Sequence, residues 1–513
     1  MRGPVAVLAL SLCACGYNGF EEAHRIHDGH ADALVAAAPY PELTPRVRPE
    51  PPARSEYPPG RRPVVKLDLP EACRLALKNN LPFLVAGEQL EVQLLSLDVL
   101  RRGWWPAAAP LTGSGTYTKT LDGPQTGAQS ATLGLSQKLP LGGTLGATYT
   151  HTGSQVAGQD AYQGTLTATY TQPLLRNSGH RQAVEEIVAA ARTARYARRT
   201  YEFNRLGLLV ATVEVYFGLL QQEQSIRNFE RALERTRQLA RQADINEKFG
   251  RVTRTDVFRS QLEVTRAESA LNDARERLAL SRNAFTIDLG IPPEFELELA
   301  PATIEYVRLP LGRDEAVALA LERNVAWLNA RDGFEDARRA LAIASNAQLP
   351  QLDLTASWTM QTDAERDVLN SYDGQTRAWS VGGTFSIPLD RSALRRDYQA
   401  AVITYRQAER DIARARDRVV RDVDAQLIVL RQVELAMEFQ RRAISDAEKA
   451  ARLAEFDYRR GRVTNRDVIE AQDRLLEAQN ALQAALVVAR IAQLRLLQFV
   501  GRLVADSEGR WLK

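Results

Sequence analysis

GRVTRTDV at residues 250–257 and GRVTNRDV at residues 461–468 are two copies of one motif, each followed by an alanine-containing segment. The match continues without gaps, at an offset of 211 residues, as far as Gly290 and Gly501. A glycine is suited to end one helix in the left-handed conformation. A threonine three residues before an aspartate fits the capping box that begins the next helix. The motif therefore predicts a tight turn between two helices in each half of the chain.

A second match supports the same division of the chain. Residues 71–80 resemble residues 315–324 at an offset of 244, and Pro106 and Pro350 keep that offset. From Pro106 to Pro173 is 67 residues, whereas Pro350 to Pro388 is 38, so the first half carries 29 extra residues there. That length suits one additional hairpin. We expect two repeats, at residues 67–300 and 301–501, and a tail at 502–513.

Long segments without glycine or proline predict long helices. Residues 389–460 form 72 such residues, which as one helix would extend ~108 Å. The returning segment, residues 462–500, and the shorter residues 325–349 would together nearly match that length. Ala478, Ala481, Ala485, Ala489 and Ala492 recur every three or four residues, which is typical of a coiled-coil seam.

Between the helices the apolar pattern changes to a period of two. Residues 165–171, 352–358 and 381–387 alternate apolar with small or polar side chains, so we expect strands at about 111–173 and 351–388. A half-buried soluble sheet would show the same alternation. Strands placed between such long helices have no soluble core to cover, which favours a membrane β-barrel. Two to six strands leave open edges, so several copies must close the ring.

The first residues resemble an export signal. Arg2 precedes an apolar run, and Leu12 and Ala14 stand three and one positions before Cys15, as in a lipoprotein signal cleaved after residue 14. Lipid, such as palmitate, would then be attached to Cys15, and residues 15–66, rich in proline, would form an extended tether. The residue after Cys15 is Gly16 and not aspartate, which by resemblance to sorted lipoproteins favours the outer membrane over retention at the inner membrane. The alternative is an ordinary signal peptide with Cys15 as a bystander.

Composition and motifs exclude several classes of function. The formal net charge is only +3, which argues against a nucleic-acid partner. The sequence has no phosphate-binding loop, HExxH motif or nucleophile elbow, so we expect no enzyme and no cofactor. We also expect no metal site, although His24, His27 and His30 recur at every third position. No uncharged apolar run is long enough to cross a membrane as a helix.

The paired GRVT turns, the two repeats and the export signal together resemble the TolC-like outer membrane factor family, also called outer membrane efflux proteins. The resemblance covers roughly residues 67–501 and implies a fold class of all-α plus membrane β. In that fold a long α-helical coiled-coil barrel joins a transmembrane β-barrel completed by trimerisation. It further implies a homotrimer in the outer membrane, with a periplasmic adaptor and an inner-membrane pump as partners. Family members usually supply four strands per chain, so the 29 extra residues leave the strand number open.

The resemblance also assigns roles to residues near the turns, at about 247–256 and 458–467. It implies a pore gate of Asp467 and Glu470, and a latch in which Tyr458 donates a hydrogen bond to Asp256. A basic latch partner falls at Val463, so Arg462 would substitute. Capping of the next helix is a further role for Asp256 and Asp467. The implied adaptor-docking turns consist of Gly250, Arg251, Val252, Thr253, Gly461, Arg462, Val463 and Thr464.

These features predict a passive exit duct that conducts substrates from the pump and is gated at the helical turns. The alternative is a non-conducting, lipid-anchored coiled-coil scaffold or tether of the cell envelope. A soluble helical assembly protein would leave the export signal unexplained. The sequence does not name the cargo.

Overall fold

The computed structural model describes residues 64–104, 107–108, 112–118, 126–156, 159–250, 252–292, 295–301, 306–361, 376–460 and 462–506. The predicted signal at residues 1–14, Cys15, His24, His27 and His30 lie outside these residues, as do Arg251 and Gly461. The chain divides into two compact units. We call them the strand unit, the described residues within Gln89–Arg198 and Asn329–Arg414, and the turn unit, the described residues within 64–88, Arg199–Leu328 and 415–506.

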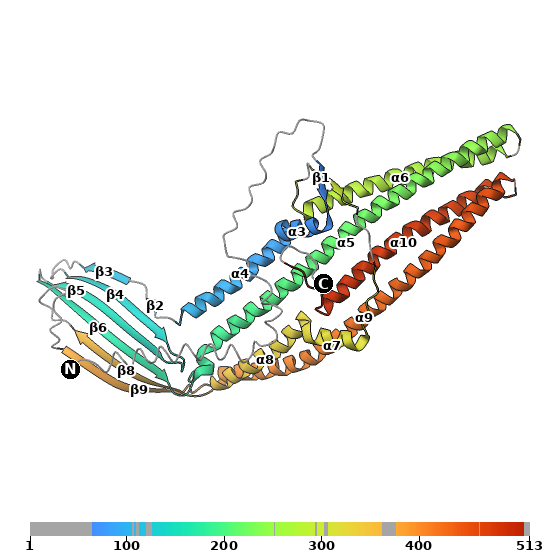
Figure 1. Ribbon diagram of the computed structural model, residues 1–513. Helices are drawn as coiled ribbons and strands as arrows, with labels where there is room; N and C mark the ends of the chain where they lie inside the picture. The colour runs from blue at the N-terminus through green and yellow to red at the C-terminus, as the bar shows by residue number, and fades with distance from the viewer. Residues whose placement is uncertain are drawn as a thin grey trace. The chain divides into compact units, whose positions relative to one another are not determined.

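The four longest described helices are α5, α6, α9 and α10 (Figure 1). Helix α9, Ser392–Arg459, has 68 residues, close to the 72 expected, and α5, His180–Lys248, has 69. The long helices end at the two predicted turns and are followed by helices of 35 residues each, α6, Arg254–Asp288, and α10, Asn465–Phe499. The shorter helices are α3 Leu69–Asn79, α4 Leu81–Arg102, α7 Arg313–Arg323 and α8 Val325–Asn346. Both α5 and α10 contain a stretch that could cross a membrane by length and composition alone.

The strand unit contains one antiparallel sheet (Figure 1). Its strands are β2 Ala107–Ala108, β3 Thr112–Thr118, β4 Thr126–Lys138, β5 Thr144–Val156, β6 Gln159–Pro173, β8 Gln351–Gln361 and β9 Thr376–Ser386. The order is β2-β4-β5-β6-β8-β9, and β3 pairs with the same edge of β4 as β2 does. The described sheet therefore has seven strands in six positions. The hairpin predicted in the first half is confirmed, because β4 and β5 pair over 13 residues each.

The pairing register separates two faces of the sheet. One row across five neighbouring strands consists of Leu135, Ala147, Ala168, Trp358 and Trp379. The next row, on the opposite face, consists of Ser136, Gly146, Thr169, Ser357 and Ser380. We call these the apolar face and the hydroxyl face. The apolar face is largely uncovered in the single chain: Trp379 is 79% and Phe385 is 62% exposed.

The core of the turn unit lies where short elements cover the long helices. The strands β1, Val64–Leu67, and β7, Glu296–Leu299, form a parallel pair that the sequence analysis did not anticipate. Tyr216 of α5 is fully buried beneath them and donates a hydrogen bond to the Ala300 carbonyl at 2.9 Å. Its cluster contains Leu67, Cys73, Leu209, Val213, Phe285 and Leu289. Burial raises the pKa of the Cys73 thiol to about 12, so this thiol is unreactive at neutral pH.

The matched sequence positions make matched contacts in the turn unit. The side-chain oxygen of Asn80 accepts the Phe83 amide, and that of Asn324 accepts the Trp327 amide, both at 3.1 Å. The Asn324 side chain also donates to the Phe499 carbonyl at 3.0 Å. Each asparagine thus begins one helix and holds the end of another.

Candidate functional site at the helical turns

The first turn joins α5 to α6 as the motif predicts. Gly250 has φ +65°, the left-handed conformation that glycine adopts with little strain. The Asp256 amide donates to the Thr253 hydroxyl at 3.3 Å, and the Thr253 amide donates to the Asp256 carboxylate at 3.2 Å. This reciprocal pair is a capping box, so the predicted capping role of Asp256 is confirmed.

The second turn joins α9 to α10 by similar bonds. The Arg462 amide donates to the Asp457 carbonyl at 2.9 Å, the long-range bond of a Schellman helix end. The Asp467 carboxylate accepts the Thr464 amide at 2.7 Å and the Thr464 hydroxyl at 2.6 Å. The capping role expected of Asp467 is therefore also confirmed.

The structure does not form the latch in the way the resemblance implied. Tyr458 is buried against Leu239 of α5 and Val468 of α10. No hydrogen bond of normal geometry joins its hydroxyl to a described residue. The Asp256 carboxylate instead accepts a hydrogen bond from the Thr253 hydroxyl at 2.7 Å. Tyr458 therefore holds the helices together by packing.

The charge of Asp256 still affects the Tyr458 hydroxyl, although no hydrogen bond joins the two side chains. Burial raises the pKa of the Tyr458 hydroxyl, and the negative charge of Asp256 raises it further, whereas Asn246 lowers it. The predicted basic partner also lies elsewhere, because Arg462 faces Asp457 at 3.8 Å. That ion pair stabilises the end of α9 and leaves Asp256 to its cap.

Both predicted gate residues have local partners. The Glu470 carboxylate pairs with the Arg474 guanidinium, one helical turn further along α10, at 2.6 Å. The hydrogen bonds from Thr464 hold the pKa of the Asp467 carboxyl below its ordinary value, and Arg466 contributes to this. Both carboxylates are exposed on the first turns of α10, so both are accessible from outside the single chain.

Exposed aromatic side chains surround the turns, which the sequence analysis overlooked. Phe249 is 72% and Phe258 is 58% exposed. The Arg254 guanidinium lies 5.8 Å from the Phe258 ring centre, and Arg460 lies 3.9 Å from that of Phe456. Such aromatic and arginine side chains are enriched in protein interfaces. The signal available in the sequence was an aromatic residue next to the glycine that ends α5.

A buried amide pair links the helices further from the turns. Asn228 of α5 is 4% exposed and donates to the Asn480 side chain of α10 at 2.8 Å. A buried amide without its partner is costly, so this pair fixes the register of the two helices. No sequence pattern indicated this pairing, because each asparagine stands alone in an amphipathic helix.

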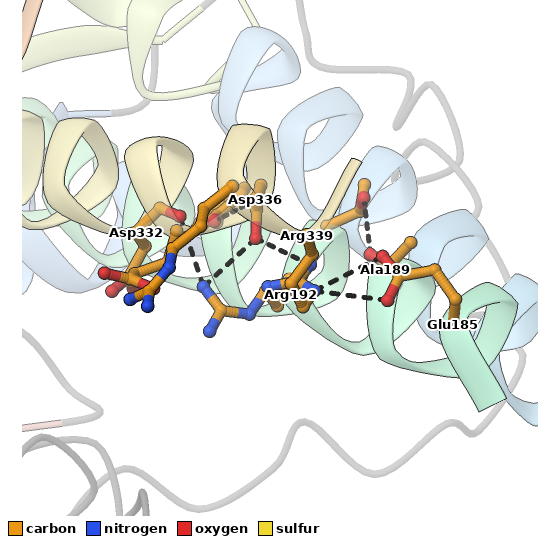
Figure 2. A network of polar contacts seen from close by, with 10 residues as sticks. Glu185, Ala189, Arg192, Asp332, Asp336 and Arg339 are labelled. Carbon is orange, nitrogen blue, oxygen red and sulfur yellow. Dashed lines mark hydrogen bonds and ion pairs between the residues drawn. The ribbon is translucent and has the colours of Figure 1, made fainter. Parts of the chain in front are cut away.

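The strand unit contains a network of ion pairs between α5 and α8, shown in Figure 2. Asp336 contacts Arg192 at 3.1 Å and Arg339 at 2.8 Å, and Arg339 reaches Glu185 at 3.2 Å. Arg192 also donates to the Asp332 carbonyl at 3.2 Å. The Tyr196 hydroxyl donates to Asp336, and burial, together with this bond, raises the tyrosine pKa to about 12. The network joins the two halves of the chain.

Sequence comparison identifies the second half of the chain. A sequence model of the family described as "Outer membrane efflux protein" matches residues 316–502. These residues are an outer membrane efflux protein domain. The resemblance found in the sequence is thereby confirmed, and the efflux protein domain includes α9, the second turn and α10.

This chain is also similar in sequence to two outer membrane proteins. It is 28% identical over 331 residues to the outer membrane efflux protein BepC of Brucella suis, which covers 63% of this chain and 69% of BepC. It is 24% identical over 334 residues to the outer membrane protein TolC of Vibrio cholerae, covering 61% and 72% of the two chains. Both relatives are named as outer membrane proteins, and BepC is named as an efflux protein.

Solved structures share the fold over a larger part of the chain. The structure of CusC matches with a TM-score of 0.65 and 15% identity, covering 87% of this chain and 95% of CusC. The outer membrane protein VceC of Vibrio cholerae matches with a TM-score of 0.64 and 18% identity, covering 84% and 96%. At these identities the likeness establishes the fold.

The Asp467 cap makes the start of α10 sensitive to pH. Because its pKa is lowered in the folded state, the charged carboxylate stabilises this helix end at neutral pH, and the effect is lost as pH falls through the lowered pKa. We expect Asp467→Asn to speed hydrogen exchange at the start of α10 at pH 7, and to match the wild type once the pH has fallen below the lowered pKa of Asp467. Glu477→Gln, an exposed change further along α10, is the control. Equal exchange in both variants at pH 7 would contradict the capping role.

Proposed function

We propose that this protein is the outer-membrane exit duct of a tripartite efflux or type I secretion system. Three copies close a β-barrel in the outer membrane, and their helices form a tunnel in the periplasm. An inner-membrane pump delivers substrates through a periplasmic adaptor, and the duct itself does no chemistry. The observation that carries this proposal is the sheet of the strand unit, which has an exposed apolar face and, among the described strands, two open edges.

Lipid would cover the apolar face of that sheet, and further copies of the chain would pair with its open edges. An exposed row of leucine, tryptophan and phenylalanine side chains is stable against lipid and not against water. Unpaired edge strands cannot remain open within a bilayer, because their amide and carbonyl groups would lack hydrogen bonds. The two repeats at residues 67–300 and 301–501, and lipid attached to Cys15, belong to the same proposal.

The helical turns are the proposed adaptor-docking and gating region. The adaptor docks on residues 250–253 and 461–464, where Phe249 and Phe258 supply exposed apolar surface. Tyr458 contributes to the closed state by packing between α5 and α10, while Asp256 and Arg462 stabilise their own turns. Asp467 and Glu470 of three copies place six carboxylates at the mouth of the tunnel, which favours cations and binds multivalent ones.

Single-channel conductance in a planar bilayer tests the gate. A trivalent cation added from the side of the turns is expected to block the wild-type channel. Replacing Asp467 and Glu470 together by alanine should weaken that block about tenfold or more, because the focused negative potential is removed. Unchanged block in the double variant would remove these residues from the gate.

Arg474→Ala is the matched control, because Arg474 neutralises Glu470 in the structure. Freeing that carboxylate should strengthen the block, opposite to the effect of the double variant. The tether hypothesis makes a different prediction, since purified trimers that insert into the bilayer would then conduct no current at all.

A further inference from the structure

The described sheet has more strands than the resemblance led us to expect. The first half of the chain fills four of the six positions, with β2 and β3 sharing one, and the second half fills two. The additional pair is the hairpin of β4 and β5, which spans 31 residues from Thr126 to Val156. This length agrees with the 29 extra residues found in the first half. The extra residues are therefore two full strands, and not a loop.

The β4–β5 hairpin obeys the same face rule as the rest of the sheet. Leu133 of β4 is opposite Tyr149 of β5, which is opposite Leu166 of β6, all on the apolar face. On the hydroxyl face Gly134, Thr148 and Thr167 are aligned in the same way. Leu133 is 49% exposed, as expected of a side chain that lacks its lipid environment. A hairpin folded into a lumen or into water would not need a row of apolar residues in register with that of β6.

The edges of the sheet are compatible with closure by further copies. All its neighbouring strands are antiparallel, so strands in the first and sixth positions run in opposite directions. Strand β9 of one copy would therefore meet the β2–β3 edge of the next as another antiparallel neighbour. An odd number of positions would instead have placed parallel strands at the junction. These open edges refer to the described strands only.

We propose that β4 and β5 are wall strands, and that three copies close an eighteen-stranded barrel, where four strands per chain would give twelve. This inference rests on the proposed trimeric duct. With strands ~4.8 Å apart and tilted by ~40°, the backbone diameter is ~36 Å for eighteen strands and ~24 Å for twelve. Barrels of that larger size leave a water-filled channel.

The wider lumen is also nearly uncharged. Among strand residues whose side chains are described, the hydroxyl face carries charge only at Lys138, the last residue of β4, and Asp353, near the start of β8. The other described residues of that face are uncharged, mostly threonine and serine with some glycine, alanine and glutamine. The barrel therefore admits bulky hydrophilic cargo of either charge, and any selection by charge or size takes place in the helical part of the duct.

Two variants of the full-length protein test where the hairpin lies. Leu133→Arg places a charge on the apolar face and should reduce the amount of assembled trimer in the outer membrane about tenfold or more, because lipid cannot solvate the guanidinium. Thr148→Arg places the same charge on the hydroxyl face of the same hairpin. It should assemble at the wild-type level and shift the ion selectivity towards anions. Normal assembly of Leu133→Arg would overturn the inference.

If both variants fail to assemble, the strands can be counted directly in the wild-type trimer. The measurement is electron cryomicroscopy of the trimer in lipid nanodiscs. Eighteen strands with β4 and β5 in the wall support the inference, and twelve strands with the hairpin outside the wall overturn it. Conductance is measured separately on the same trimers. Twelve strands with normal conductance would leave the proposed duct standing, whereas eighteen strands without conductance would contradict the duct and keep the barrel.

Discussion

Replacing Gly501 by alanine is expected to destabilise the turn unit by ~2–4 kcal/mol, through backbone strain and steric overlap. Gly501 follows the end of α10 with φ +69°, where a side chain is unfavourable. An added Cβ would lie 2.5 Å from the Cβ of Arg323. Because that atom is fixed to the backbone at the end of α7, it cannot move aside as a flexible side chain would.

The matched glycine in the first half provides an independent test. Gly290 has φ +66°, and an added Cβ would lie 2.6 Å from the Cβ of Asn79. We expect Gly290→Ala to have a similar effect to Gly501→Ala. Both can be measured as lower midpoints of thermal unfolding by circular dichroism on the detergent-purified protein.

Gly218→Ala is the control for these substitutions. Gly218 lies within α5 at a normal helical φ, and an added Cβ would meet nothing within 4 Å. Alanine should stabilise the helix there by ~0.5–1 kcal/mol. A Gly501→Ala variant whose unfolding midpoint lay within a degree of the wild type would contradict the close approach of α7 to the end of α10.

Replacing Asp336 by alanine is expected to destabilise the strand unit by ~2–3 kcal/mol, less than for a fully buried ion pair because Asp336 is 30% exposed. Its carboxylate contacts two guanidinium groups and the Tyr196 hydroxyl. Without it, Arg192 and Arg339 would lie close together and would lose the acid that contacts both of them, although Glu185 and Asp332 remain nearby. The loss should appear in thermal unfolding and as faster proteolysis at the junction of α5 and α8.

An exposed ion pair on the same helix provides the comparison. Glu335 and Arg338 lie 3.8 Å apart, with 46% and 70% of their side chains exposed. Glu335→Ala should change stability by less than ~0.5 kcal/mol, as for most surface pairs. A double-mutant cycle of Asp336 with Arg192 separates their coupling from the loss of packing. A coupling near zero would show that the network in Figure 2 contributes nothing to stability.

Local patterns were sufficient to predict most of the helical fold. The uninterrupted residues 389–460 predicted α9, because a long segment of good helix formers without glycine or proline favours one continuous helix. The threonine and aspartate of each GRVT motif predicted the two capping boxes, since these bonds form between residues three positions apart. Alternation of apolar residues predicted the strands for the same local reason.

Contacts between distant residues were not predictable in this way. The sequence did not indicate that Asn228 would meet Asn480, or that Arg192 would meet Asp336, because each pair depends on how two helices pack. The expected bond from Tyr458 to Asp256 was wrong for this structure. The carboxylate had a nearer partner in Thr253, which lies only three residues away.

The sequence by itself determined the approximate lengths of α8, α9 and α10, the positions of both turns and the two faces of the strands, because these depend on spacing along the chain. Only the tertiary structure decided that the 29 extra residues form β4 and β5 within one continuous sheet, in six positions. Strand alternation is the same in an isolated hairpin and in a sheet. The hydrogen-bond register with β3 and β6 is what places the hairpin between them.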